Sequence, residues 1–149
     1  MAVLASTDER NAIAEIAESW IGVPYHHQGR TRIGCDCIGL LIGVWCEWSG
    51  EDAPEAVVYA PDWHIKTPDL LHNSVSSYMH EVEDHGPGDV LLFTVGSSRL
   101  PRHTGIVSTD PSRIVHAYSL RSMNKAGQTV KKTTYQSFDL HSAWRAEAI

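Results

Sequence analysis

Long apolar runs are missing from this sequence of 149 residues. The longest apolar stretch, at residues 40–45, is far shorter than the roughly 20 residues that a membrane-spanning helix needs. The N-terminus carries Asp8 and Glu9 and lacks the basic head and long apolar core of a secretory signal. We therefore expect a soluble protein that is made in the cytoplasm without a signal peptide.

An excess of basic residues is missing as well. Twelve Lys and Arg stand against eighteen Asp and Glu, which gives a formal net charge of −6. Proteins that bind DNA or RNA neutralise many phosphates with Lys and Arg. The charge balance therefore argues against a nucleic-acid partner.

Cysteine is scarce, with three residues in the chain. Cys35 and Cys37 are separated by one residue, which is too close for an unstrained bridge between them. An odd count of this kind does not make a disulfide framework. We expect at least one free thiol.

The remaining composition is that of an ordinary globular protein, with 42% hydrophobic and 20% charged residues. No internal repeat, low-complexity tract or linker interrupts the chain. A chain of this length can bury a sizeable core without a disulfide or a metal. We predict a single domain over residues 1–149.

The first half of the chain favours helices. Ser6 and Glu9 resemble a capping box, and apolar residues at helical spacing predict a helix over 7–20. Gly22 and Pro24 end this helix, and residues 25–34 have no period and predict an irregular loop.

A second helix is predicted from Cys37 to just before Ser49, because the residues there are apolar on nearly all sides. Asp36 is a suitable N-cap. Cys37 then lies in the first turn, where unpaired N–H groups and the helix dipole favour a thiolate.

After a predicted loop over residues 53–66, a third helix is expected to start at 67–69 and to reach Met79. After this helix the residue pattern favours β-strands. Four strands are predicted, at 89–95, 104–109, 113–119 and 129–135, the middle two forming an antiparallel hairpin. Helices followed by a sheet indicate an α+β domain.

Motifs for nucleotide hydrolysis, zincins and serine hydrolases are missing, which leaves cysteine chemistry. His103 enters one predicted strand and His116 lies in the next, and alternation puts them on one sheet face. If that face packs on the start of the cysteine helix, His103 can take the thiol proton of Cys37 while His116 orients His103.

Five short segments, in order, resemble the NlpC family of papain-like cell-wall peptidases. Together they extend from about residue 20 to Tyr118. The segments are residues 23–25 (Val-Pro-Tyr), 34–40 (Gly-Cys-Asp-Cys-Ile-Gly-Leu), 87–90 (Pro-Gly-Asp-Val), 103–107 (His-Thr-Gly-Ile-Val) and 115–117 (Val-His-Ala).

The resemblance implies a papain-like (NlpC-type) α+β fold, in which N-terminal helices that carry the cysteine pack on an antiparallel sheet that carries the histidines. It makes Cys37 the nucleophile, with its backbone N–H serving the oxyanion. His103 would be the base and later the acid, His116 the orienting residue, and Tyr25 a hydroxyl near the thiol. No cofactor or metal is implied.

Substrate binding is assigned by the same resemblance to Asp36, Ile38 and His26. The family cleaves amide bonds of peptidoglycan stem peptides, commonly between D-γ-glutamyl and a diamino acid. Ile38 stands where the family usually has serine, which removes a hydroxyl from the start of the helix and bears on which bond is cut.

Within the family, residues 26–28, 35–40, 44–45 and 59–63 resemble peptidases encoded with phage and gene-transfer-agent tails. This resemblance implies a virion component carried on a phage-like tail, which reaches the periplasmic cell wall from outside during entry. The implied partners are stem peptides and other tail-tip or hub proteins, without nucleic acid or membrane insertion.

Three alternatives remain open. The chain could be a catalytically silent tail-tip module that binds neighbouring proteins or the wall, or an acyltransferase or amidase on the same fold. Cys35, Cys37 and nine histidines could also form a zinc site, although a Cys-x-Cys without a second paired cluster departs from the usual spacings. Cys35 is expected to have no role, and Cys46 to be a core residue.

Overall fold

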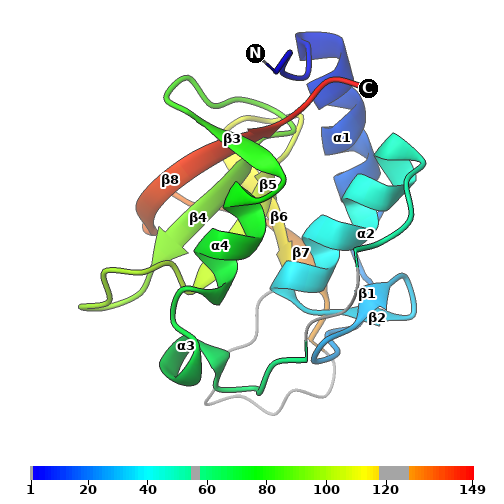
Figure 1. Ribbon diagram of the computed structural model, residues 1–149. Helices are drawn as coiled ribbons and strands as arrows, with labels where there is room; N and C mark the ends of the chain where they lie inside the picture. The colour runs from blue at the N-terminus through cyan, green and yellow to red at the C-terminus, as the bar shows by residue number, and fades with distance from the viewer. Residues whose placement is uncertain (1, 55–57, 118–127) are drawn as a thin grey trace.

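The structure is a computed structural model that describes residues 2–54, 58–117 and 128–149. Helices α1 (Thr7–Glu18) and α2 (Cys37–Ser49) pack together on one face of a six-stranded antiparallel sheet, against β5 and β6 (Figure 1). A short helix, α4 (Leu70–Ser76), lies beside β3. The predicted α+β class is confirmed.

The first helix forms as its cap predicts. Ser6 Oγ accepts a hydrogen bond from Glu9 N at 3.2 Å, and Glu9 Oε1 accepts one from Ser6 N at 3.1 Å. This reciprocal pair satisfies two N–H groups that the helix itself cannot pair. The helix ends at Glu18, two residues before the predicted end, and Trp20 turns into the core with 1% of its surface exposed.

The second helix starts at Cys37 as predicted and ends at Ser49, one residue beyond the predicted end. Asp36 caps its N-terminus, and Gly50 closes its C-terminus in the left-handed conformation with φ of 76°. The preceding loop is less irregular than expected, because it contains a small antiparallel ladder between β1 (Arg30–Thr31) and β2 (Gly34–Cys35).

The third helical region differs from the prediction. Part of the predicted loop forms the short helix α3 (Trp63–Lys66). The helix expected to reach Met79 ends at Ser76, and Met79 instead opens β3 (Met79–Val82). Pairing of β3 with β8 explains this, since backbone hydrogen bonds to a distant strand outweigh local helical spacing.

The four predicted strands are confirmed as β4 (Val90–Thr94), β5 (His103–Val107), β6 (Arg113–Ala117) and β7 (Val130–Thr134). Residues 118 and 119, which the prediction included in the third of them, lie outside the described residues. The sheet order is β3-β8-β4-β5-β6-β7, and β8 (Asp139–Ala146) was not predicted. In the β5/β6 hairpin, Ile106 pairs with Val115 and Val107 with Ile114.

Two hydrophobic clusters cover the two faces of the sheet. The larger one lies between the helices and the sheet and includes Ile106, Val115 and residues of α1 and α2. The smaller one includes Val107 and Ile114 on the opposite face and is flanked by Tyr135 and Phe138. Successive residues of β4, β5, β6 and β8 thus belong to opposite clusters.

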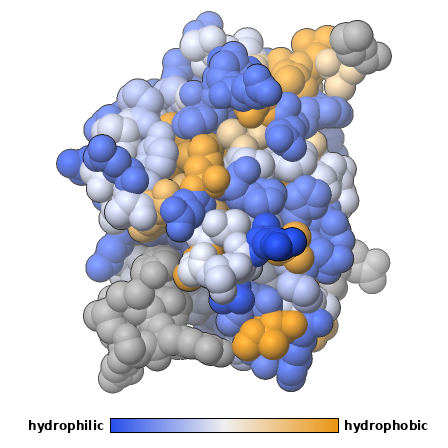
Figure 2. Space-filling model, turned by 90° about the vertical axis from the view of Figure 1, so that its left-hand side faces the viewer, coloured by the Kyte–Doolittle hydropathy of each residue, from blue (hydrophilic) through white to orange (hydrophobic). Residues whose placement is uncertain are grey.

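The surface seen in Figure 2, from the left-hand side of Figure 1, is mixed. Hydrophobic residues form small groups that polar residues separate. None of the helices in the described ranges combines the length and apolar character that crossing a membrane requires.

Candidate active site

The site is organised around the buried carboxylate of Asp36. Oδ1 accepts a hydrogen bond from Gly39 N at 2.7 Å, which is the N-cap of α2. Oδ2 accepts two, from Gln28 N at 2.8 Å and from the Tyr59 hydroxyl at 2.5 Å. The carboxylate therefore joins the start of the cysteine helix to two separate loops.

The approach of the 26–36 loop to α2 depends on glycine. A Cβ at Gly39 would collide with the carbonyl oxygen of Gly29. The absence of a side chain lets the loop backbone lie directly against the first turn of the helix, beside Cys37.

Cys37 is the first residue of α2, as predicted, but its thiol is not acidic. Burial raises the pKa of Cys37 well above its ordinary value, and the neighbouring charge of Asp36 raises it further. Hydrogen bonds from the backbone N–H groups of Ile38 and Cys37 lower it by less. The helix start thus favours a thiolate locally, as expected, but desolvation of the charged sulfur outweighs the amides.

Two tyrosine hydroxyls lie near the thiol. Burial raises the pKa of Tyr25, and the charges of Cys37, Asp36 and Cys35 raise it further. The role of this hydroxyl in the site stays a prediction. Burial and the charge of Asp36 likewise raise the pKa of Tyr59.

Tyr59 is a site residue that the sequence reasoning missed. It lies 23 positions beyond Asp36 in a segment predicted as loop, so no local period links the two residues. His27 supports it: Nε2 lies 2.9 Å from the Tyr59 carbonyl oxygen, and the two rings meet edge to face at 5.3 Å. The resemblance of residues 59–63 to tail-associated peptidases was the only signal.

His103 and His116 form a buried pair, as their shared strand face predicts. His103 Nε2 lies 2.7 Å from His116 Nδ1, and His116 Nε2 lies 2.8 Å from Thr133 Oγ1 on β7. The chain of hydrogen bonds orients His103 through His116.

Both imidazoles are neutral over the ordinary pH range. Burial, with the charge of His116, lowers the pKa of His103 to about 3. Burial, with the charge of Lys131, lowers the pKa of His116 to about 4. At neutral pH the site therefore holds a protonated thiol and two neutral imidazoles.

The histidines project from the sheet face that carries Val107 and Ile114. The His103 ring stacks with Phe93 at 6.3 Å, and the edge of Phe138 lies 5.9 Å from the ring of His116. The face that packs on α2 instead carries Ile106 and Val115. Whether this pair of imidazoles reaches the thiol of Cys37 at the start of α2 stays a prediction.

The other predicted site residues lie near the start of α2 or in the preceding loop. Ile38 is buried, with 6% exposure, and lines a cavity beside α2. His26 is exposed, and its Nδ1 lies 2.9 Å from the His27 carbonyl oxygen. Whether these residues and Asp36 bind substrate stays a prediction.

The remaining thiols differ from Cys37 in their surroundings. Cys35 is fully buried, and burial, with the charge of Asp36, raises its pKa to about 12. Cys46 is half-buried in the middle of α2. Within the described ranges, no group of three or more His, Cys, Asp or Glu side chains is placed to hold a metal ion.

Comparisons with known proteins bear on this arrangement. No protein-family model matches the chain. The sequence is similar to the probable endopeptidase NlpC of Escherichia coli (strain K12), with 24% identity over 110 residues. The similar region covers 73% of this chain but 62% of that relative, so the chain spans less than two thirds of its length.

Solved structures with the same fold are NlpC/P60 proteins. The NlpC/p60 domain of the peptidoglycan hydrolase SagA matches with a TM-score of 0.61 at 22% identity, over 91% of this chain and 97% of that one. NlpC2 from Trichomonas vaginalis matches with a TM-score of 0.67 at 16% identity, over 97% of this chain and 49% of that one. An NLP/P60 family protein from Staphylococcus aureus matches with a TM-score of 0.61 at 19% identity, over 97% of this chain and 43% of that one.

These likenesses define the class of fold. The chain has the papain-like α+β fold of NlpC/P60 domains, as the sequence resemblance implied. The chain is similar in sequence to a probable endopeptidase and in fold to the domain of a peptidoglycan hydrolase.

Proposed function

We propose that this protein is a cysteine endopeptidase that hydrolyses amide bonds of peptidoglycan stem peptides, between D-γ-glutamyl and a diamino acid. The similarity to a probable endopeptidase and to the domain of a peptidoglycan hydrolase supports the reaction class. The observation that carries the proposal is the buried hydrogen bond of 2.7 Å between His103 and His116. Burying two imidazoles costs free energy unless they are hydrogen-bonded, and buried titratable pairs of this kind occur most often at functional sites.

The proposed reaction begins from neutral groups. His103 accepts the proton of the Cys37 thiol as the sulfur attacks the carbonyl carbon, and His116 holds the ring of His103 in position. Collapse of the adduct breaks the C–N bond and forms a thioester, while His103 returns the proton to the leaving amine. Water then hydrolyses the thioester with His103 as base. The backbone N–H of Cys37 is proposed to stabilise the oxyanion.

The contact between the Cys37 thiol and His103 belongs to the proposal. His103 Nε2 is held at 2.7 Å from His116 Nδ1. Catalytic hydrogen bonds are often long without substrate and tighten in the complex. We therefore propose that substrate binding brings the thiol and the imidazole into contact.

The proposed setting is the tail of a phage-like particle or gene transfer agent, where the enzyme opens the wall locally during entry. The resemblance of residues 26–28, 35–40, 44–45 and 59–63 to tail-associated peptidases supports this. In this proposal the protein is made in the cytoplasm, carried by tail-tip or hub proteins, and acts on the periplasmic wall.

A second candidate is a catalytically silent tail-tip module that binds its neighbours or the wall. The buried, protonated state of the Cys37 thiol favours it, because a pre-formed thiolate would be the more direct sign of a working nucleophile. The paired histidines favour the enzyme.

The test is digestion of peptidoglycan from a bacterium that contains diaminopimelate. Fragments released by wild type, by Cys37→Ala and by Cys46→Ala are identified by mass spectrometry. Cys46 lies in the same helix and serves as the matched control. New stem-peptide fragments from wild type and Cys46→Ala, and none from folded Cys37→Ala, are expected. Equal release by Cys37→Ala would exclude a cysteine peptidase, and no release by any variant would favour the silent module.

A further inference from the structure

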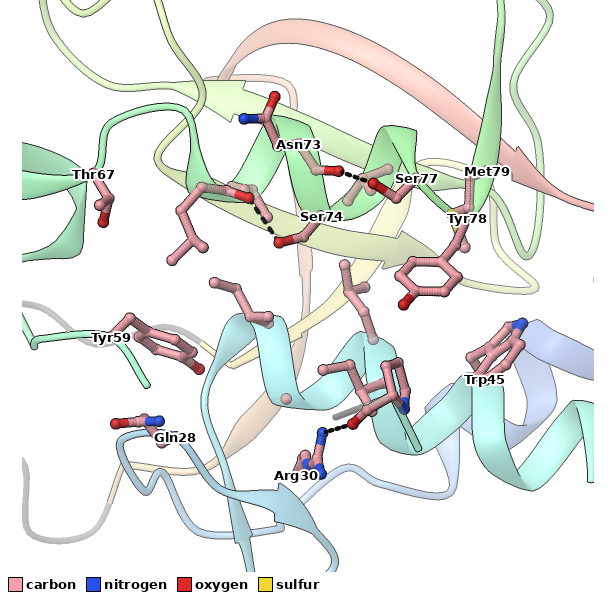
Figure 3. Close-up of a pocket in the computed structure, with 18 of the residues that line it drawn as sticks. Gln28, Arg30, Trp45, Tyr59, Thr67, Asn73, Ser74, Ser77, Tyr78 and Met79 are labelled. Carbon is pink, nitrogen blue, oxygen red and sulfur yellow. Dashed lines mark hydrogen bonds between the residues drawn. The ribbon is translucent and has the colours of Figure 1, made fainter. Parts of the chain in front are cut away.

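A cavity of about 440 Å³ lies between α2 and α4 (Figure 3). Its floor is a stripe of α2 at helical spacing, formed by Ile38, Leu41, Ile42 and Trp45. Leu71 and Val75 of α4 line the opposite side and are buried. The volume and the apolar lining are those of a small-molecule site.

The cavity begins beside the candidate active site and extends away from it. Tyr59 and Gln28 lie at one end, and Trp45 and Tyr78 at the other (Figure 3). The Trp45 and Tyr78 rings meet at 6.1 Å. From Ile38 to Trp45 the helix rises about 10 Å at 1.5 Å per residue. An elongated ligand fits this shape better than a compact one.

Among the described residues that line the cavity, Arg30 is the one cation. In Figure 3 Arg30 lies between the two ends, and its Nη1 donates a hydrogen bond to the Pro54 carbonyl oxygen at 2.8 Å. Within the described ranges Arg30 forms no ion pair with a carboxylate. Asp69, which also lines the cavity, is exposed at the start of α4 and accepts a hydrogen bond from Asn73 at 3.2 Å. An arginine beside an apolar cavity suits an anionic head group.

We propose that this cavity binds a carboxylic acid with an aliphatic chain of about ten carbons. The chain lies between α2 and α4, and the carboxylate pairs with Arg30. A cavity of about 440 Å³ lies within the size range of small-ligand sites and leaves room for a ten-carbon acid. Charged stem peptides do not suit this lining, since an unpaired charge in an apolar site is costly. The site therefore goes beyond the proposed peptidase activity.

Isothermal titration of the full chain with sodium decanoate and with 1-decanol tests the two parts of the proposal. Wild type is expected to bind decanoate with a Kd on the order of 10 to 100 µM. Arg30→Gln is expected to weaken decanoate binding about tenfold and to leave decanol binding unchanged. Equal affinity of wild type and Arg30→Gln for decanoate would overturn the assignment of the head group.

A cavity-filling variant tests the position of the chain. Ser74 of α4 lines the cavity, whereas Ser76 is exposed and does not. Ser74→Leu is expected to abolish binding of both ligands, and the matched control Ser76→Leu to bind as wild type does. Circular dichroism and the melting temperature establish that both variants are folded. No binding by wild type at 1 mM ligand, as an order-of-magnitude limit, or undiminished binding by folded Ser74→Leu, would overturn the site.

Discussion

Two opposing effects set the chemistry of the Cys37 thiol. The backbone N–H groups of the first turn of α2 stabilise a thiolate, and burial together with the charge of Asp36 destabilises it. Burial is the larger effect, so the thiol is protonated at neutral pH. In a peptidase with this site, the thiolate nucleophile must form by proton transfer from Cys37 to His103 during the reaction. A thiolate–imidazolium ion pair in the resting enzyme would not supply it.

The raised pKa of Cys37 predicts slow alkylation by iodoacetamide at pH 7. Only the thiolate reacts, so the rate should rise about tenfold per pH unit from pH 7 to 9 and continue upward beyond the range where a free thiol levels off. Mass spectrometry of the modified peptide measures the rate at Cys37 separately from Cys46. N-acetylcysteine provides the control, and a rate at Cys37 that is already constant at pH 7 would contradict the raised pKa.

The histidine pair predicts acid sensitivity of the fold. Its pKa values of about 3 and 4 lie below the ordinary value of 6.5, so the unfolded chain takes up protons first as the pH falls. The stability that the neutral pair confers is complete above pH 6.5 and is lost toward pH 4. Urea denaturation should show the free energy of unfolding falling by up to about 2.7 kcal/mol per pH unit between these values.

A His116→Gln variant tests which groups cause this slope. It removes one of the two titrating imidazoles while keeping a polar partner for His103, so the slope should fall to about half. A slope equal to that of wild type would mean that other groups control the acid transition.

At the scale of elements, α2 is held at its start by one carboxylate. Oδ2 of Asp36 receives Gln28 N and the Tyr59 hydroxyl, while Oδ1 receives Gly39 N. The Asp36 side chain therefore stabilises both the helix and the tertiary structure, because it also hydrogen-bonds the two loops that contain Gln28 and Tyr59.

Asp36→Asn should be destabilising although it preserves the shape of the side chain. The amide has one oxygen for Gly39 N, and its NH2 group would face the N–H of Gln28, which is also a donor, while the hydroxyl of Tyr59 would have to turn and accept. We expect a loss of about 2 to 3 kcal/mol in urea denaturation, and about 1 to 2 kcal/mol for Tyr59→Phe.

The matched control is Asp62→Asn at the start of α3, where no side-chain capping bond exists. Its effect should stay within about 0.5 kcal/mol. A similarly small loss for Asp36→Asn would show that the buried carboxylate does not hold the helix start.

At the scale of the whole molecule, the two ends of the chain are tied together on the sheet (Figure 1). Ala5 N donates to the Ala146 carbonyl oxygen at 2.9 Å. Nearby, the fully buried Asp89 at the start of β4 pairs with Arg145 of β8 at 2.9 Å and with Arg10 of α1 at 3.5 Å. One carboxylate thus connects the first helix, the middle of the chain and the last strand.

Asp89→Ala should lower the free energy of unfolding by about 3 kcal/mol or more, because it leaves two largely buried guanidinium groups without their carboxylate. Asp84→Ala is the control: Asp84 also lies near Arg145, at 3.5 Å, but its side chain is 85% exposed. Its loss should be within about 0.5 kcal/mol. Equal effects of the two variants in urea denaturation would mean that burial does not strengthen the Asp89 pair.

Much of this protein could be predicted from local patterns. The capping box at Ser6 and the apolar run after Asp36 predict their helices within two residues, because caps and periodicity act over one or two turns. The alternation of strand side chains likewise predicts that His103 and His116 share a face. The order of short motifs predicts the papain-like fold, which the structural likenesses confirm.

What the local patterns missed depends on contacts between distant segments. The edge strand β3 exists because it pairs with β8, and Tyr59 joins the site because the fold brings it onto Asp36. Sequence spacing carries no signal for either contact.

The sequence by itself determined where the cysteine and the histidines stand on their elements. Only the tertiary structure decided their protonation, because desolvation depends on how many atoms from other segments surround each group. The same packing leaves an apolar cavity between α2 and α4, two helices whose separation no single segment specifies.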